Sequence, residues 1–286
     1  MKKILITGAN SYIGTSFETY IKQNFPADFF VDTLNMIDGS WRDYDFSKYD
    51  VVFHVAGIAH SDTIKATKEE INKYYEVNTD LTIETAKKSK QSGVKQFIFM
   101  SSIIVFGTKN NRITSVTKPK PDNFYGDSKL QADIGIHMLE DNAFKVVSIR
   151  PPMIYGCGSK GNYPIMAGFA KKTPVFPKYN NKRSMLYIEN LCEFLKVIID
   201  NEETGYFYPQ NTEYVNTSYM VYLIARNSGK RIILTKLFNP MIWLFRKNKI
   251  IKKVFGDMYY DQDMSKYKTW YNKVSFEKSI ERTERV

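Results

Sequence analysis

A tyrosine and a lysine stand four residues apart in the stretch "YGDSKL" (125–130), with only small or polar residues between them. Four residues make about one helical turn, so Tyr125 and Lys129 lie on the same face if the stretch is a helix. A nearby ammonium group favours the phenolate and lowers a phenol pKa that normally lies near ~10. Such a tyrosine can exchange protons at neutral pH. A surface pair without function is the alternative interpretation.

Short apolar runs alternate with segments of helical periodicity over the first half of the chain. The runs predict strands, and the periodic segments predict helices. This alternation predicts an α/β fold with a doubly wound parallel sheet, in which ligands bind at the carboxyl ends of the strands. The expected strands are 2–8, 29–36, 49–57, 94–102 and 144–152, and the expected helices are 15–25, 68–93 and 129–142.

Two glycines bracket the turn that follows the first expected strand, in "TGANSYIG" (7–14). Backbone amides at such a strand-to-helix turn, together with the helix dipole, can hold a pyrophosphate. Gly8 and Gly14 therefore indicate a dinucleotide site, with an ordinary tight turn as the alternative. His54 lies inside the third expected strand, where a hydrogen-bonded core histidine is the better interpretation than a ligand.

Seven pieces occur in order: "TGANSYIG", "DVVFHVAG", "EVNTDLT", "FIFMSSIIVFG", "YGDSK", "RPPMIYG" and "RSMLYIENL". This set resembles the extended short-chain dehydrogenase/reductase family, which contains nucleotide-sugar epimerases and dehydratases, and the resemblance runs from about residue 3 to 200. It implies a Rossmann-type NAD(P)-binding domain at 1–156 and about 182–212. A smaller, mostly C-terminal lobe for the nucleotide sugar would comprise about 157–181 and 213–286.

The resemblance also gives the tyrosine and the lysine roles. Tyr125 matches the acid/base tyrosine, and Lys129 matches the lysine that holds the nicotinamide ribose and lowers the tyrosine pKa. Ser102 matches the residue that hydrogen-bonds the substrate oxygen, and Ser101 would take its place if the register were off by one. Hydride transfer at a sugar carbon must be accompanied by proton transfer at its oxygen, which these residue types can provide.

The dinucleotide site departs from the family pattern at Ser11, where a third glycine is usual. No arginine stands at the end of the second strand, so we expect NAD(H), with Asp32 or Asn35 near the ribose. Arg42 leaves NADP(H) open. The residues that the resemblance places at the cofactor are Gly8, Ser11, Tyr12, Ile13, Gly14, Asn35, Asp45, Phe46, Val55, Ala56, Gly57, Asn78, Tyr125, Lys129 and Pro152.

The resemblance implies a UDP-sugar-type substrate near Asn162 and Arg183, beside Ser102 and Tyr125. Dehydratases carry an Asp-Glu pair directly after the catalytic serine or threonine, whereas this chain has two isoleucines at 103 and 104. The remaining reactions are 4-ketoreduction and 4-epimerisation. The short chain and its tail favour reduction of a UDP-4-keto-6-deoxy-HexNAc for surface polysaccharide synthesis. A UDP-sugar 4-epimerase is the alternative, and a non-catalytic NAD(P)-binding sensor or scaffold is the second.

Charge and composition bear on partners and location. The formal net charge is +11, and the segment from Arg226 to Lys253 holds nine Lys or Arg and no Asp or Glu, interleaved with "LFNPMIWLF". This segment is expected either to pack with a solvated basic face or to contact an anionic membrane or a membrane glycosyltransferase. We expect no metal, no nucleic acid, a homodimer as in relatives, and a cytoplasmic location that includes the inner membrane surface.

Overall fold

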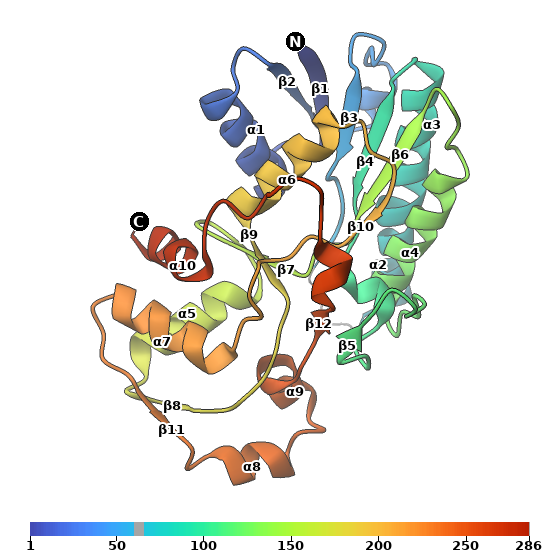
Figure 1. Cartoon of the computed structure of the whole chain (residues 1–286). Coiled ribbons are helices and arrows are strands. Elements are labelled where there is room, and N and C mark those ends of the chain that lie inside the picture. Colours follow the sequence, from blue (N-terminus) through green and yellow to red (C-terminus); the bar gives the residue numbers. More distant parts are fainter. Residues whose placement is uncertain (60–65, 286) are drawn as a thin grey trace. The chain divides into compact units, whose positions relative to one another are not determined.

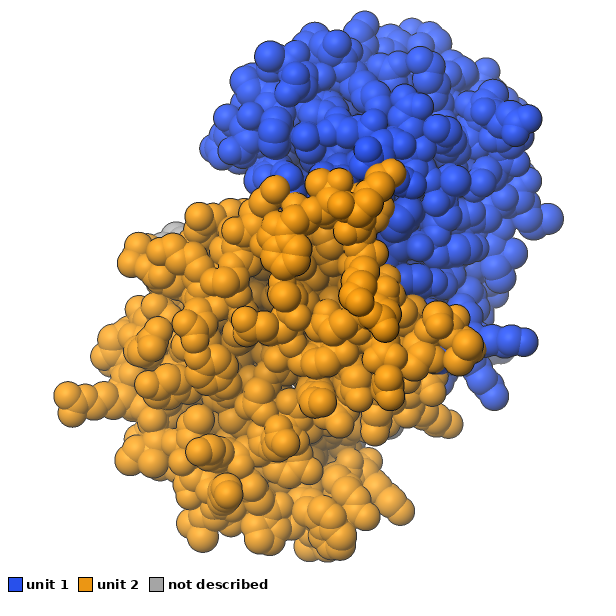
Figure 2. Space-filling view, in the orientation of Figure 1, with its two compact units in different colours: residues 1–108, 117–151, 191–209 blue, residues 109–116, 152–190, 210–286 orange. Residues whose placement is uncertain are grey.

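The computed structural model describes residues 1–59 and 66–285 (Figure 1). The chain forms two compact units, coloured separately in Figure 2. Unit 1 comprises 1–108, 117–151 and 191–209, and unit 2 comprises 109–116, 152–190 and 210–286.

Unit 1 is built on a six-stranded sheet in the order β10-β6-β4-β3-β1-β2, and every neighbouring pair is parallel. The predicted α/β fold class is therefore confirmed, and all five expected strands are present. A sixth strand, β10, was not expected, since it has only three residues. The bounds are β1 (Lys2–Thr7), β2 (Phe29–Leu34), β3 (Val51–His54), β4 (Gln96–Met100), β6 (Lys145–Ile149) and β10 (Gly205–Phe207).

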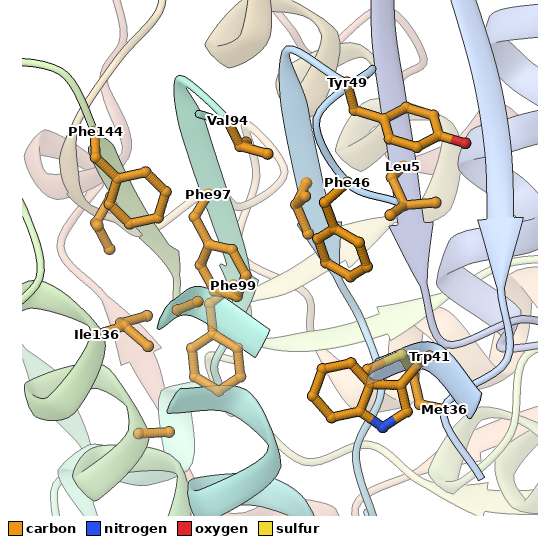
Figure 3. Packing of buried hydrophobic residues seen from close by; sticks show 14 residues of the cluster. Leu5, Met36, Trp41, Phe46, Tyr49, Val94, Phe97, Phe99, Ile136 and Phe144 are labelled. Atoms are coloured by element: carbon orange, nitrogen blue, oxygen red, sulfur yellow. The ribbon is translucent and has the colours of Figure 1, made fainter. Parts of the chain in front are cut away.

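The central strands are almost wholly buried because helices cover both faces of the sheet. On one face, Phe97 and Phe99 of β4 pack with Ile136 of α4 in a buried cluster (Figure 3). On the other face, Phe53 of β3 meets Phe17 of α1 edge to face, with ring centroids 5.3 Å apart. The helices of unit 1 are α1 (Tyr12–Asn24), α2 (Lys68–Tyr75), α3 (Leu81–Gln91), α4 (Phe124–His137) and most of α6 (Ile188–Asp200), with 3₁₀ turns η1 (Ser40–Arg42) and η3 (Ile103–Phe106).

Two of the helices differ from the sequence expectation. The helix expected over 68–93 is divided by a π-helical turn, η2 (Glu76–Asp80). Helix α4 begins at Phe124, five residues earlier than expected, because Asn123 caps it: its side-chain oxygen accepts a hydrogen bond from the Gly126 amide at 2.8 Å. The early start is what places both Tyr125 and Lys129 on one helix.

Unit 2 contains three small two-stranded sheets and several short helices. The structure groups residues 109–116, 152–156, 182–190 and 210–212 with unit 2, where we had expected the dinucleotide-binding domain. Two strand pairs account for most of this difference, because β7 pairs in parallel with β9, and β5 with β12, in small sheets of their own. The elements are β5 (Arg112–Ile113), β7 (Met153–Tyr155), α5 (Asn162–Lys172), β8 (Val175–Pro177), β9 (Met185–Tyr187), α7 (Thr217–Asn227), β11 (Ile233–Thr235), α8 (Asn239–Leu244), α9 (Lys249–Phe255), β12 (Tyr259–Tyr260), η4 (Gln262–Ser265) and α10 (Phe276–Glu284).

Within residues 1–59 and 66–285, no helix is both long and apolar enough to span a membrane.

Candidate active site

The tyrosine and the serine singled out from the sequence lie at the carboxyl edge of the sheet. Tyr125 stands in the first turn of α4, and Ser102 follows β4 and caps η3, where its hydroxyl accepts a hydrogen bond from the Ile104 amide at 3.3 Å. The Ser102 hydroxyl lies close enough to the Tyr125 phenol to favour its phenolate form. A substrate oxygen placed beside this pair can therefore meet two hydroxyl groups at once.

The structure also settles which of the two serines faces the phenol. The Ser101 hydroxyl donates to Asp133 Oδ2 at 2.9 Å, and Arg150 Nε donates to the same oxygen at 2.9 Å. Asp133 is fully buried. Ser101 therefore belongs to a buried polar network behind the sheet, and Ser102 is the serine next to Tyr125.

Lys129 is buried just below this edge. Its ammonium group donates to the Met100 carbonyl at 2.9 Å and lies 4.6 Å from the centroid of the Phe99 ring. Burial lowers the pKa of Lys129 to about 8, and the negative charge of Asp133, one helical turn further along α4, partly opposes this shift.

The expected lowering of the tyrosine pKa is not what the structure shows. Burial raises the pKa of Tyr125 above its usual value, and the Ser102 hydroxyl opposes that shift only in part. Burial destabilises the phenolate by more than the neighbouring groups stabilise it. A group that arrives with its own positive charge would shift the balance toward the phenolate.

The chain that follows β3 passes directly against Lys129. A Cβ atom on Gly57 would lie 3.0 Å from both the Lys129 ammonium and the Asn78 side-chain oxygen, so only glycine fits there comfortably. Asn78, in the π-helical turn, accepts a hydrogen bond from the Ile58 amide at 2.8 Å and donates to the Ile58 carbonyl at 3.0 Å. The extra residue of a π turn commonly marks functional sites, and here it presents this amide to the strand end.

The glycine turn after β1 is also closely packed. Gly8 has φ +117°, and a Cβ there would lie 2.6 Å from the Ala56 amide nitrogen. Ser11, which replaces the usual third glycine, is the N-cap of α1, and its hydroxyl accepts a hydrogen bond from the Gly14 amide at 3.2 Å. The backbone at Gly8, which carries no side chain, and the start of α1 could hold a pyrophosphate. Ser11 occupies the position of the usual third glycine and caps the helix instead.

Three residues near the end of β2 are candidates for contact with the ribose, and their positions differ. Asp32 lies in the middle of the strand, and its carboxylate accepts a hydrogen bond from the Tyr49 hydroxyl at 2.6 Å. Asn35 is the first residue after the strand and is exposed. The Arg42 guanidinium makes two hydrogen bonds to the Glu84 carboxylate, at 2.5 and 2.6 Å. Of these three, Asn35 is the residue that the backbone places at the strand end.

Asp45 and Phe46, the expected adenine contacts, have opposite environments. Asp45 is exposed and accepts hydrogen bonds from the Ser47 amide and hydroxyl, which hold its pKa below its usual value. The Phe46 side chain is fully buried in the core cluster. Only the backbone of Phe46 is therefore able to meet a ligand.

Three of the predicted residues belong to unit 2. Pro152 is buried before β7, and Asn162 is the first residue of α5. Arg183 donates through one guanidinium nitrogen to the carbonyls of Lys253 and Gly256, both at 3.0 Å. Burial lowers the pKa of Arg183, which shows that its charge is incompletely compensated and would be stabilised by an anion.

Two features of the site were missed from sequence. Asp133 follows Lys129 by four residues, so its place on the same helix face was available as a signal. The π-helical turn at Asn78 had no recognisable signal.

His54 lies in the core as expected, with hydrogen bonds to Thr7 at 2.8 Å and Thr82 at 3.1 Å, and burial lowers its pKa to about 3. Within the described residues, no group of three or more His, Cys, Asp or Glu side chains could hold a metal ion.

Comparison with known proteins agrees with the fold. The model of the NAD dependent epimerase/dehydratase family matches residues 4–208, and the chain belongs to that family. It is therefore an NAD-dependent enzyme that modifies nucleotide sugars.

Two curated relatives are 4-epimerases. A UDP-glucose 4-epimerase from Vibrio cholerae is 30% identical, over 91% of this chain and 87% of the relative. An N-acetyl-alpha-D-glucosaminyl-diphospho-ditrans,octacis-undecaprenol 4-epimerase from Escherichia coli O157:H7 is 29% identical, over 71% of this chain and 65% of the relative.

Solved structures show the same fold. A UDP-glucuronic acid 4-epimerase from Bacillus cereus in complex with NAD superposes with a TM-score of 0.70 at 16% identity, over 99% of this chain and 95% of that one. A dTDP-4-dehydrorhamnose reductase from Bacillus anthracis in complex with NADP has a TM-score of 0.65 at 17% identity, over 84% of this chain and 86% of that one.

The lowered pKa of Lys129 predicts a rise in stability at alkaline pH. Between about pH 8 and ~10.4, the unfolded chain holds a proton that the folded chain has released, so the free energy of unfolding rises with pH. At ~1.4 kcal/mol per pKa unit, this contribution is at most about 3 kcal/mol. Urea unfolding at pH 8 and pH 10 should show it in the wild type and not in Lys129→Met. The exposed Lys87→Met is the control, and parallel pH profiles for wild type and Lys129→Met would contradict the prediction.

Replacement of Ser101 and of Ser102 by alanine should lower the free energy of unfolding by different amounts. Ser101→Ala leaves the buried Asp133 carboxylate without one donor and should lower the free energy of unfolding by about 1–3 kcal/mol. Ser102→Ala, at a partly exposed hydroxyl, should cost less than about 1 kcal/mol. Urea denaturation of both variants is the measurement, and equal losses would argue against the assignment of Ser101 to the core network.

Proposed function

We propose that this enzyme interconverts the two C4 epimers of a UDP-sugar, either UDP-glucose and UDP-galactose or their N-acetyl forms. The observation that carries the chemistry is the placement of Tyr125 beside Ser102 at the carboxyl edge of the sheet, one helical turn from the buried Lys129. The two 4-epimerases among the relatives support epimerisation as the outcome. The surroundings of Ser102 support the exclusion of dehydration, because the next two side chains are isoleucines and cannot transfer protons.

Each residue has one task in this reaction. A bound NAD would supply hydride acceptance and hydride donation at the sugar C4 carbon. Tyr125 removes the proton from the C4 hydroxyl while the hydride leaves, and gives it back to the same oxygen when the hydride returns. Ser102 hydrogen-bonds that oxygen throughout. Lys129 would hold the nicotinamide ribose.

Epimerisation replaces the reduction that we favoured from the chain length and the tail. Both reactions move a hydride and a proton at C4, and so the site described above serves either of them. A reductase takes a fresh reduced dinucleotide in every cycle, whereas an epimerase retains its own. The reductase remains the competing outcome of the test below.

We propose NAD(H) rather than NADP(H) as the dinucleotide. Asn35 at the end of β2 offers an amide to a free ribose 2′-hydroxyl, and the pairing of Arg42 with Glu84 removes the nearest candidate for a 2′-phosphate. The pyrophosphate would lie at Gly8 and Gly14, the adenine at Asp45 and the backbone of Phe46, and the nicotinamide ribose at Lys129 and Asn78. Arg183 and Asn162 are the proposed contacts for the sugar nucleotide.

The purified protein should interconvert UDP-glucose and UDP-galactose, or the N-acetyl pair, without added dinucleotide. Product ratio by chromatography and product mass by mass spectrometry are the measurements, because an epimerase leaves the mass unchanged. A parallel reaction should supply a UDP-4-keto-6-deoxy-HexNAc with NADH or NADPH. Consumption of one NAD(P)H per sugar, with a mass gain of two hydrogens and no epimerisation, would establish the reductase instead.

Tyr125→Phe should lower kcat by about 10²–10⁴ while leaving the affinity for NADH nearly unchanged, because the phenol acts at the sugar oxygen. Ser102→Ala should also lower kcat, by less. Ser101→Ala, once allowance is made for its stability, should retain most of the wild-type rate and is the matched control. A wild-type rate in Tyr125→Phe would refute the acid/base assignment.

A further inference from the structure

The segment around α8 exposes large apolar side chains that a surface helix normally buries. Only Ile242 points into unit 2, where it is 3% exposed, while Trp243 and Leu244 beside it are 59% and 67% exposed. The segment does not pack into the core with a solvated basic face, as one reading of the sequence expected. The side chains more than half exposed are Leu237, Met241, Trp243, Leu244, Phe245 and Ile250.

The positive charge of the protein is concentrated around these side chains. Residues 160–183 and 226–253 together hold 15 of the 41 Lys and Arg residues and none of the 30 Asp and Glu residues. The remainder of the chain therefore carries 26 basic and 30 acidic residues, which is a net negative charge. The net charge of +11 is a property of these two segments, and we call their exposed part in β8, β11, α8 and α9 the basic-apolar face.

The basic-apolar face is held by defined contacts. Strand β11 pairs in parallel with β8, and this register sets the exposed Ile233 beside the exposed Val175 (Figure 1). At the start of α8, the Asn239 side chain donates to the Lys178 carbonyl at 3.0 Å. The two basic segments, distant in sequence, are therefore joined in one structure.

A cation and an exposed aromatic ring are paired on this face. The Arg246 guanidinium carbon lies 4.2 Å from the centroid of the Trp243 ring, and the same side chain donates to the Trp243 carbonyl at 2.9 Å. Tryptophan and arginine are the residue types that place an apolar body at the boundary of a bilayer and a charge at its headgroups.

We propose that the basic-apolar face docks this enzyme on the surface of an anionic lipid bilayer. Trp243, Leu244 and Phe245 enter the boundary between headgroups and acyl chains, and the surrounding lysines and arginines meet the lipid phosphates. The absence of any acidic residue in both segments matches a negatively charged surface. The proposal is independent of the reaction catalysed and brings the enzyme to the membrane without a spanning helix.

Flotation with lipid vesicles tests the docking. The full-length protein should bind vesicles of equal phosphatidylcholine and phosphatidylglycerol, bind phosphatidylcholine vesicles much more weakly, and lose affinity for the mixed vesicles as salt is added. No binding to the mixed vesicles, or equal binding to both kinds, overturns the proposal.

Variants locate the docking surface. Trp243→Ala with Leu244→Ala should lower the affinity for mixed vesicles at least tenfold, and Lys247→Gln with Lys253→Gln should lower it by on the order of fivefold for each charge removed. The controls are Trp270→Ala, since Trp270 is 61% exposed outside the face, and Lys118→Gln with Lys120→Gln. Wild-type binding by the first two variants overturns the proposal. So does conversion of an oligomer to a monomer by Trp243→Ala with Leu244→Ala without any vesicle binding, because the face would then be a subunit interface.

Tryptophan fluorescence provides a second test of the docking, and this test does not depend on a variant with weakened vesicle binding. The chain has three tryptophans, of which Trp41 is buried and Trp243 and Trp270 are exposed. In Trp270→Phe, the emission should shift to shorter wavelength when mixed vesicles are added, because Trp243 enters a less polar region. Unchanged emission under conditions where the protein floats would show that another part of the chain makes the contact.

Discussion

The burial of the Lys129 ammonium group is the constraint on which the carboxyl edge of the sheet depends. A charge removed from water must be compensated, and three neighbours do this: the Met100 carbonyl at 2.9 Å, the face of the Phe99 ring and the field of Asp133. The pKa of about 8 shows that the compensation is incomplete. The lysine is thus held in a position that favours further partners, such as the hydroxyl groups of a ribose, and Gly57 leaves it in contact with the strand end where they would arrive.

The same burial explains why the two serines diverge. Asp133 supports Lys129 from one helical turn away, but a fully buried carboxylate needs donors of its own, and Ser101 and Arg150 supply them. With Ser101 directed into that network, the extended backbone after β4 directs Ser102 to the other side, toward Tyr125. The arrangement of the Ser102 and Tyr125 hydroxyls, which are proposed to meet the sugar oxygen, therefore depends on the buried ion pair between Asp133 and Arg150.

The sequence predicted what local pattern determines and missed what tertiary packing determines. Five strands and the α/β class follow from periodicity, whereas the helix that Tyr125 and Lys129 share begins at the Asn123 cap, five residues earlier than periodicity indicated. The three-residue strand β10 and the π-helical turn at Asn78 leave no periodic signal, and the pairing of β7 with β9 moved two segments into unit 2. Burial decided the direction of the Tyr125 pKa, and a sequence does not contain burial.

The net charge of the chain is a second property whose meaning depends on the folded structure. A net charge of +11 suggests an acidic partner, but a formal charge carries no position. The basic residues of 226–253 could equally have lined a cleft or covered the outer side of a buried helix. Their meaning changes because α8 turns its tryptophan, leucine and phenylalanine outward beside them, and a cation next to an exposed ring is suited to a surface that is both anionic and apolar. A lipid bilayer combines these two properties, and so the placement of the apolar residues, more than the charge itself, carries the inference.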